Sequence, residues 1–186
     1  ELKRNTDSTF IELKSSPAQN LTVQLGMRRD AASKLDTKTS PSAGVRYDFS
    51  DTGTSIKAHY SEGFRPPSFF ALGIGVFGNP NLKSETSHGY EFGVDQAMLG
   101  NKARAGLTWF KTDYRNLIDF DSTTFTFVNR DKVEASGTEF DLQLRPTDQL
   151  QIALNHSYTD TTILDSQAKL RNRPKQRSAF SARYAP

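Results

Sequence analysis

Apolar and polar residues alternate over long stretches of the chain. The period is two from Leu21 to Arg28, where apolar side chains occupy most of the odd positions. The same period recurs in residues 43–49, 55–60, 90–95, 103–109, 139–145, 150–157 and 180–184, and weakly in residues 8–14. Such alternation predicts β-strands with one apolar and one polar face. We therefore predict an all-β, antiparallel chain of about nine strands, most of them about 10 residues long.

The connections between these strands alternate in length. Short turns are predicted at residues 15–20, where Pro17 is expected to stop the first strand, and at residues 50–54, 97–102 and 146–149. Long connections are predicted at residues 30–42, 63–87, 115–132 and 159–176. Up-and-down barrels of the bacterial outer membrane have short turns at one rim and long loops at the other. The pattern therefore favours an antiparallel up-and-down transmembrane β-barrel segment.

Composition and charge limit the folds and the partners that the chain can have. Hydrophobic residues make up 35% of the chain, and its 24 basic and 21 acidic residues give a net charge of +3. No run approaches the roughly 20 apolar residues of a membrane helix, and no basic segment indicates binding to nucleic acid. Alternating strands also occur in soluble sandwiches, so a soluble or surface β-rich binding or adhesion domain is the alternative. The charged polar rows favour the barrel, because they suit a wet lumen better than a packed core.

The connection between residues 63 and 87 is the longest of the four. Pro66 and Pro67 lack backbone donors and are expected to end the preceding strand, and the next strand is expected to begin only after Ser87. Phe69–Phe77 is the one weak helix candidate, and it is too rich in glycine to hold an isolated helix. Loops longer than about 15 residues are usually functional or disordered, so this connection is the first place to look for a site.

Three motifs in this region resemble a known family. Phe64-Arg65-Pro66-Pro67-Ser68 is followed by Asn79-Pro80-Asn81-Leu82-Lys83-Ser84-Glu85 and by Tyr90-Glu91-Phe92-Gly93. In this order they resemble the barrel of TonB-dependent outer-membrane receptors of the cobalamin and siderophore receptor type, which usually have Pro at the position of Ser84. Two further sets are similar to the starts of later strands in that family: Asn129, Val133, Gly137 and Glu139, and Leu170, Arg173, Pro174 and Lys175.

The resemblance implies active import. Members of the family have an N-terminal plug inside a barrel of about 22 strands, bind a scarce nutrient such as an iron-siderophore or cobalamin, and are energised through TonB. This chain has no plug and no TonB box, and it ends at Ala185-Pro186 without a terminal aromatic strand. We therefore expect residues 1–186 to be an internal part of a receptor barrel in the bacterial cell outer membrane. The open edges of such a piece should be covered by the rest of the barrel or by an unusual closure.

The candidate site residues lie in the long connection. From the resemblance, polar contacts to the lumen or plug are expected from Arg65, Asn79, Asn81, Lys83 and Glu85. Ligand contact by stacking is expected from Phe69, Phe70 and Phe77, with packing inside the loop as the alternative. The expected partners are a metal-chelate or cobalamin ligand, the plug domain, the TonB complex and outer-membrane lipid.

Other chemistries find no support in the sequence. His59, His88 and His156 are far apart and have no ligand at metal-site spacing, so we predict neither a metal site nor a cofactor. Cysteine is absent and no hydrolase or metalloprotease motif occurs, so we do not expect an enzyme. A basic run is either an exposed loop or a site of attraction for anionic lipopolysaccharide or an anionic ligand; it comprises Arg171, Arg173, Lys175 and Arg177.

Overall fold

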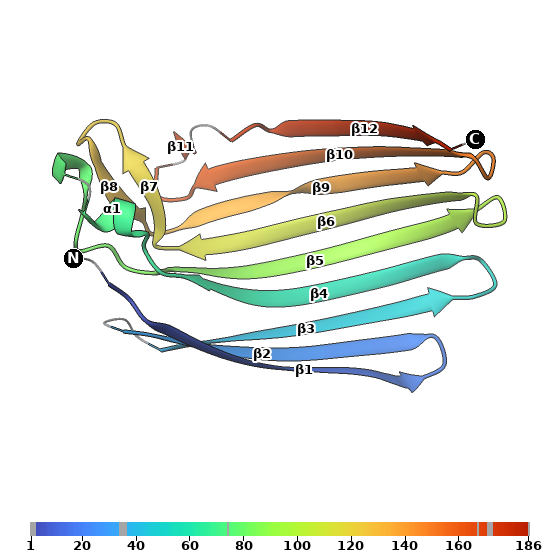
Figure 1. Ribbon diagram of the computed structural model, residues 1–186, viewed down its shortest axis with the longest axis horizontal. Helices are drawn as coiled ribbons and strands as arrows, with labels where there is room; N and C mark the ends of the chain where they lie inside the picture. Colours follow the sequence, from blue (N-terminus) through green and yellow to red (C-terminus); the bar gives the residue numbers. More distant parts are fainter. Residues whose placement is uncertain (1–2, 34–36, 74, 167, 171–172, 186) are drawn as a thin grey trace.

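The computed structural model describes residues 3–33, 37–73, 75–166, 168–170 and 173–185, and within them the chain is almost entirely β-structure (Figure 1). One sheet contains ten strands, and every pair in it is antiparallel. In order across the sheet they are β1 (Thr6–Ala18), β2 (Leu21–Ala32), β3 (Lys38–Phe49), β4 (Thr54–Arg65), β5 (Glu85–Met98), β6 (Ala103–Arg115), β9 (Val133–Leu144) and β10 (Leu150–Ile163), with β11 (Ala168–Lys169) and β12 (Gln176–Tyr184) both paired to β10. The predicted antiparallel, up-and-down all-β architecture is confirmed.

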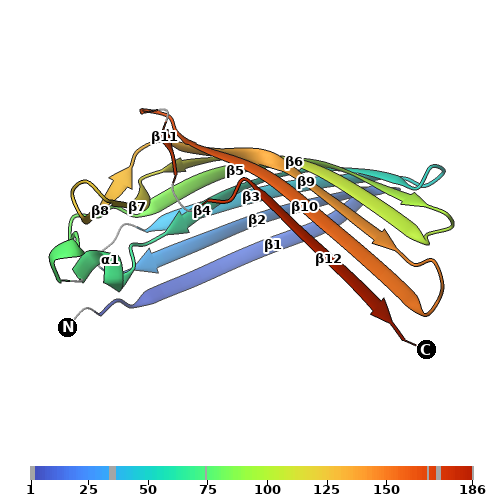
Figure 2. The ribbon, with the colours of Figure 1, turned by 90° about the horizontal axis from the view of Figure 1, so that it is seen from above.

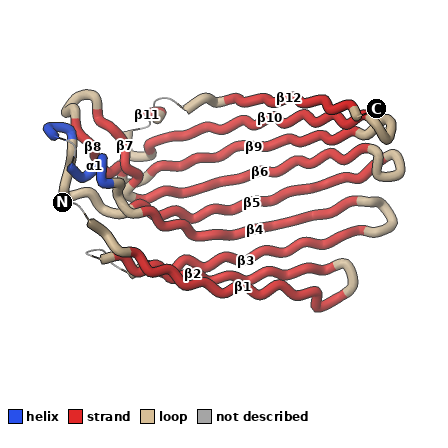
Figure 3. Tube along the Cα trace, in the orientation of Figure 1, coloured by secondary structure: helices blue, strands red, loops and turns tan. Residues whose placement is uncertain are grey.

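The sheet is twisted and bent like part of a cylinder wall (Figure 2). Apart from β11, its strands contain 9 to 14 residues and lie side by side, with the tight turns gathered at one end and the longer connections at the other (Figure 3). Within the described residues, β1 and β12 each pair with a single neighbour, so the sheet is not closed. The second sheet is a small hairpin of β7 (Leu117–Asp121) and β8 (Thr126–Arg130), placed between β6 and β9 at the end of the longer connections.

One face of the sheet is apolar and remains exposed. Register places Val94 beside Leu107 and Leu107 beside Phe140, so that apolar side chains form rows across the strands. Leu107 is 55% exposed and Phe92 is 51% exposed, although both lie in central strands. No second layer of described residues covers this face, whereas a sandwich would bury it against another sheet. An exposed apolar face of this kind is expected of a barrel wall that contacts lipid.

The opposite face is polar and is held together by charge pairs. Arg46 of β3 contacts the Asp48 carboxylate at 2.8 Å and the Asp95 carboxylate of β5 at 3.6 Å. Ser55 of β4 receives a hydrogen bond from Arg46 and donates one to Asp48. Lys57 lies 3.4 Å from Asp95. Such a network suits a water-filled or plugged lumen, where charged groups stay partly hydrated.

The turns at one end of the sheet confirm the predicted short connections, with one difference in detail. Residues 50–53, 99–102 and 145–149 connect their strands as expected, and residues 19–20 form a tighter turn than predicted. Asn20 has a φ of 65° there, a left-handed conformation that Asn adopts more readily than most residues. The first strand does not stop at Pro17. It continues to Ala18 through a register shift between Ser15 and Ala18, because an edge strand with a bulge can leave the missing amide of proline unpaired.

The predicted long connection at residues 30–42 is wrong. Asp30 still pairs with Lys38 across β2 and β3, so only residues 33–37 join the two strands. The observed strand includes Pro41, although proline has no amide to donate to a ladder. Pairing of β3 with β4 begins at Ser42, so Pro41 has a ladder partner only on β2. The three other long connections are present, at residues 66–84, 116–132 and 164–175.

Residues 66–84 contain more structure than predicted. The strand before them ends at Arg65 as expected, but β5 begins at Glu85 rather than after Ser87, because Glu85 pairs with Arg65. The sequence 69–77 folds into α1 (Phe69–Gly73) and a 3₁₀ turn, η1 (Gly75–Phe77), although it is rich in glycine. The Ser68 hydroxyl accepts a hydrogen bond from the Ala71 amide, which caps this short helix. Tertiary packing holds it, since Ala71 is 3% exposed.

Among the described residues, no helix is both long enough and apolar enough to cross a membrane.

Candidate functional site

Two of the three long connections at one end of the sheet join into a single structure, which we call the loop rim. It consists of residues 66–84 and the hairpin of β7 and β8, residues 117–130. The Asn79 side-chain amide donates a hydrogen bond to the Phe127 carbonyl at 2.9 Å, and the Thr126 hydroxyl donates one to the Phe77 carbonyl at 3.1 Å. Two segments far apart in sequence are therefore bonded side by side above the ends of β4, β5, β6 and β9 (Figure 1).

The side chain of Asn129 forms the junction between these segments. Its oxygen accepts a hydrogen bond from the Lys83 amide at 2.9 Å, and its nitrogen donates to the Lys83 carbonyl at 3.0 Å. The same nitrogen donates to the Asn116 carbonyl at 2.7 Å. Asn116 has a φ of 55°, at the point where β6 turns into the hairpin. One carboxamide thus satisfies backbone groups at the base of the hairpin and at the end of residues 66–84.

A chain of aromatic rings covers the rim. Phe70 lies edge-on to Phe127 with ring centroids 5.7 Å apart, and Phe127 lies edge-on to Phe120 at 5.4 Å. Phe120 in turn contacts Phe77 at 6.2 Å. Phe70 nevertheless remains 58% exposed, and Phe77 remains 43% exposed. The rings therefore pack against one another and still present aromatic surface outward.

The segment that precedes β1 also reaches the rim. The guanidinium of Arg4 donates a hydrogen bond to the Pro67 carbonyl at 2.8 Å and lies 5.0 Å from the centre of the Phe69 ring. Cation–π contacts of this kind favour a fixed ring orientation. Phe69 is 43% exposed, so one part of its ring is held by Arg4 and the rest faces solvent.

Two arginine contacts and a tight turn stabilise the hairpin itself. Arg130 of β8 lies 3.3 Å from the carboxylates of both Asp119 and Asp121 on β7. The Thr123 amide donates a hydrogen bond to Asp121 at 2.8 Å. This backbone hydrogen bond is the largest cause that lowers the pKa of Asp121, and the charge of Arg130 acts in the same direction. The hairpin is therefore most stable with Asp121 ionised.

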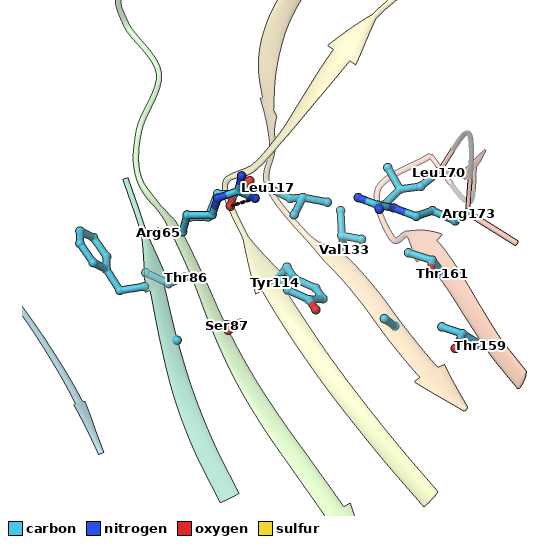
Figure 4. A pocket seen from close by; sticks show the side chains of 14 residues that line it. Arg65, Thr86, Ser87, Tyr114, Leu117, Val133, Thr159, Thr161, Leu170 and Arg173 are labelled. Carbon is cyan, nitrogen blue, oxygen red and sulfur yellow. Dashed lines mark ion pairs between the residues drawn. The ribbon is translucent and has the colours of Figure 1, made fainter. Parts of the chain in front are cut away.

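Below the rim, the polar face of the sheet contains an open cavity of about 500 Å³. Its walls come from the ends of β4, β5, β6, β9 and β10 and from the connection after β10. Arg65 and Arg173 lie on opposite sides, with Tyr114 and Val133 between them (Figure 4). Hydroxyl groups on β5 and β10 complete the polar part of the wall and belong to Ser87, Thr159 and Thr161.

Positively charged side chains outnumber negatively charged ones in the cavity. Glu85 is 8% exposed, and its carboxylate accepts a hydrogen bond from the Ile118 amide at 2.8 Å. It also lies 3.6 Å from the guanidinium of Arg65, whose side chain is 76% exposed. Arg173 adds a second guanidinium to the wall. Two cations and one carboxylate leave a net charge of +1, which favours an anionic group in the cavity.

The structure brings the polar residues named from the sequence close together and shows their contacts within the chain. The side chain of Asn79 bonds to the hairpin and accepts a hydrogen bond from the Asn81 amide at 2.9 Å, while Glu85 bonds to Ile118 and Arg65. Lys83 bonds to Asn129 through its backbone, and its side chain is not used in that contact. Contact of these five residues with a lumen or plug partner stays a prediction.

The phenylalanines named from the sequence lie in the rim, as described above. Ligand contact by Phe69, Phe70 and Phe77 stays a prediction, and so does the alternative of packing within their own loop. Phe70 and Phe77 contact rings of the hairpin, which belongs to another connection. Sequence reasoning did not identify Phe120, Phe127 or Tyr114 as members of a site. The alternation in β6 places Tyr114 on the polar face, but only the register with β5 and β9 shows that it faces the cavity.

The three histidines are dispersed. The pairing registers place His59 on β4, His88 on β5 and His156 on β10, and His88 lies 3.5 Å from Glu62. Among the described residues, no group of three or more histidine or carboxylate side chains could hold a metal ion. Of the basic run, Arg171 lies outside the described residues, Arg173 lines the cavity and Lys175 lies 3.3 Å from Asp160.

Comparison with known proteins gives consistent results. Residues 2–186 match the family model described as "TonB dependent receptor-like, beta-barrel". Among curated proteins, the ferric-pyoverdine M114 receptor PbuA of Pseudomonas sp. (strain M114) is 25% identical over 146 residues, covering 74% of this chain and 17% of PbuA. The match thus spans only a small part of that relative.

Solved structures share the fold. A mutant of the ferric enterobactin receptor PfeA from Pseudomonas aeruginosa matches 97% of this chain and 30% of its own, with a TM-score of 0.79 and 21% identity. The copper transporter OprC matches 98% of this chain and 33% of its own, with a TM-score of 0.81 and 16% identity. In both cases the described sheet corresponds to about a third of the larger chain.

Proposed function

The chain belongs to the TonB-dependent receptor-like β-barrel family of the bacterial outer membrane, and we propose that it forms part of the wall of a receptor that binds and imports a metal chelate. The full match to the family supports a barrel wall. The position of the loop rim and the cavity at the same end of that wall supports binding there. This second observation carries the proposal, because it combines exposed aromatic surface with a net positive charge in the cavity.

A ferric siderophore fits this combination of surfaces. Aromatic groups of a chelate can stack on the exposed rings of Phe70 and Phe77, while its anionic groups enter the cavity between Arg65 and Arg173. The names of PbuA and PfeA refer to ferric-siderophore receptors, and that of OprC refers to copper. Cobalamin has no such support among these three relatives, and it remains the less favoured ligand of the proposal.

The remaining parts of the receptor follow from the family. We infer that residues 1–186 are one section of a barrel of about 22 strands, in which other strands cover the open edges of β1 and β12. A plug inside that barrel would face the polar side of the sheet. The exposed side chains of Arg65, Asn81 and Lys83 would then be available for hydrogen bonds and charge pairs with it. TonB would supply the energy for transport, and no enzymatic step is involved.

The proposal is tested in the full-length receptor that contains this segment. A strain lacking the receptor is grown with single iron sources: a ferric catecholate, a ferric hydroxamate and ferric pyoverdine, and separately with cobalamin as the only source of that vitamin. We expect loss of growth on one ferric chelate, and the same loss when TonB is deleted. The purified receptor should bind that chelate, and Arg65→Ala combined with Arg173→Ala should weaken binding.

Normal growth of the deletion strain on every iron source, with no chelate bound by the purified receptor, would refute import of a ferric siderophore. A growth defect confined to cobalamin would refute a ferric siderophore as the ligand, but it would still support a transporter. Growth that depends on the receptor and is unaffected by deletion of TonB would refute the energetic part of the proposal.

A further inference from the structure

The loop rim joins two connections that no strand pairing links. Residues 66–84 leave β4 and return into β5, whereas the hairpin leaves β6 and returns into β9. In Figure 1 α1 and the β7–β8 hairpin lie together at one end of the sheet. A ligand bound by aromatic side chains from both connections needs them in one fixed arrangement, because ordering mobile loops on binding costs free energy. The contacts between the two connections supply this fixed arrangement.

Asn129 makes the contact that is best suited to this task. A carboxamide carries one acceptor and two donors on a short, rigid side chain. Here the acceptor faces the Lys83 amide, and the nitrogen faces the carbonyls of Lys83 and Asn116. The pair of bonds to Lys83 imitates the exchange of two bonds between opposed residues of an antiparallel sheet. A side chain thus replaces the strand pairing that the two connections lack.

Other contacts also join the two connections. Glu85 lies two residues after Lys83, and its carboxylate receives the Ile118 amide at the start of the hairpin. The contact of Asn79 with the Phe127 carbonyl and the ring contacts lie farther out on the rim. If the junction opens, each of these contacts has to hold two separately mobile segments. The side chain of Asn129, in contrast, bonds to the backbone of both connections.

We propose that Asn129 is a positioning residue that makes residues 66–84 and 117–130 one rigid unit, and so sets the relative positions of the aromatic side chains that meet the ligand. The rigidity is a property of the chain itself. Only the consequence for binding rests on the proposed function. Asn129 touches no expected ligand group and yet sets the geometry of the aromatic residues that do.

Two variants and a control separate this role from a general loss of stability. Asn129→Ala removes all three hydrogen bonds. Asn129→Asp keeps the shape and the acceptor for the Lys83 amide, but it places a carboxylate oxygen against two carbonyls, so we expect it to behave like Asn129→Ala. Asn155→Ala removes the same side chain from β10, outside the rim, and should match the unmodified protein. All three are made in the full-length receptor in detergent or lipid.

The first measurement is the distance between the two connections. The chain contains no cysteine, so spin labels can be attached through Val76→Cys, at a position that is 85% exposed, and through Thr124→Cys at the exposed tip of the hairpin. We expect one narrow distance distribution in the unmodified protein and in Asn155→Ala. The distribution should broaden in Asn129→Ala and Asn129→Asp. Hydrogen exchange should accelerate together at the Lys83 and Ile118 amides, although the side chain of Asn129 accepts a hydrogen bond from the first and the second donates to Glu85.

The second measurement is the affinity for the ferric chelate identified in the growth test. We expect Asn129→Ala to weaken binding by about tenfold, because the ligand would then have to order the two connections when it binds. An unchanged distance distribution, or faster exchange at Lys83 without any change at Ile118, would overturn the proposal. Broadened distances with unchanged affinity would overturn its consequence for binding. The distance and exchange results do not depend on any ligand, so they stand or fall apart from the proposed function.

Discussion

Leu107→Arg places a positive charge in the middle of the apolar face. On β6 this face runs through Ala103, Ala105, Leu107 and Trp109, and the first charged residue on it is Lys111. Four residues of a strand that is tilted by about 40° span about 10 Å along the membrane normal. Leu107 therefore lies about 10 Å below the charged level of Lys111, close to the centre of the apolar band.

The expected cost follows from this depth. An arginine on the lipid face of an outer-membrane barrel costs about 2–4 kcal/mol at the midplane and almost nothing near the interfaces. The position of Leu107 is central, and its side chain is 55% exposed, so no neighbouring side chain shields a substituent there. We expect a loss of about 2–4 kcal/mol, which lowers the folding equilibrium roughly 30- to 900-fold.

The matched control is Thr108→Arg, the next residue along β6. It faces the polar side, where it pairs with Gly93 on β5 and Glu139 on β9. We expect a change within about 0.5 kcal/mol, because a charge there meets water or a lumen partner. The assay is the folded fraction in lipid vesicles across a urea series, read from the shift in gel mobility between unheated and heated samples. Equal losses for the two variants would refute the assignment of lipid to the apolar face.

Three further outcomes follow from single sites. Gly137→Ala should lower stability by more than about 2 kcal/mol in the same assay, because a Cβ there would overlap the Tyr158 carbonyl oxygen. Val133→Ala, at a position that is 1% exposed, should cost about 1.5–3 kcal/mol, whereas Val76→Ala at 85% exposure should cost almost nothing. The pKa of Asp121 is lower folded than unfolded, so its stabilising effect is complete above the ordinary carboxyl range and disappears as the pH falls through its folded pKa. Exchange at the Thr123 amide should accelerate over that acidic range in the unmodified protein and should not do so in Asp121→Asn; an acid response that is the same in both would contradict this reasoning.

The strands were predictable because each has one apolar face. A period of two needs no knowledge of the neighbouring strand, and it identified the central part of nearly every long strand of the sheet. Strand ends were less predictable where proline occurs. Pro17 is tolerated because it lies in a bulge of an edge strand. Pro41 is tolerated because it lies just outside the β3–β4 ladder, which begins at Ser42. Both conditions depend on strand pairing.

The site was predictable only in part. Arg65, Asn79 and Glu85 were found because they belong to motifs within one segment, and the structure places them at the rim or the cavity. The hairpin and the role of Asn129 could not be derived, because Asn129 bonds to Lys83 across 46 positions of sequence and no local pattern encodes such a contact. The helix at residues 69–73 was missed for a similar reason, since packing against other segments outweighs its glycine content.

The central claim is that lipid lies on one face of the sheet and water or a plug on the other. The most direct test uses single cysteines from position 104 to position 109 of β6, each carrying a spin label, in the full-length receptor in lipid vesicles. Collision rates are measured with oxygen, which partitions into lipid, and with a water-soluble nickel chelate. We predict oxygen access at positions 105, 107 and 109, and lower oxygen access at 104, 106 and 108. The same access at all six positions, or the opposite alternation, would contradict the claim.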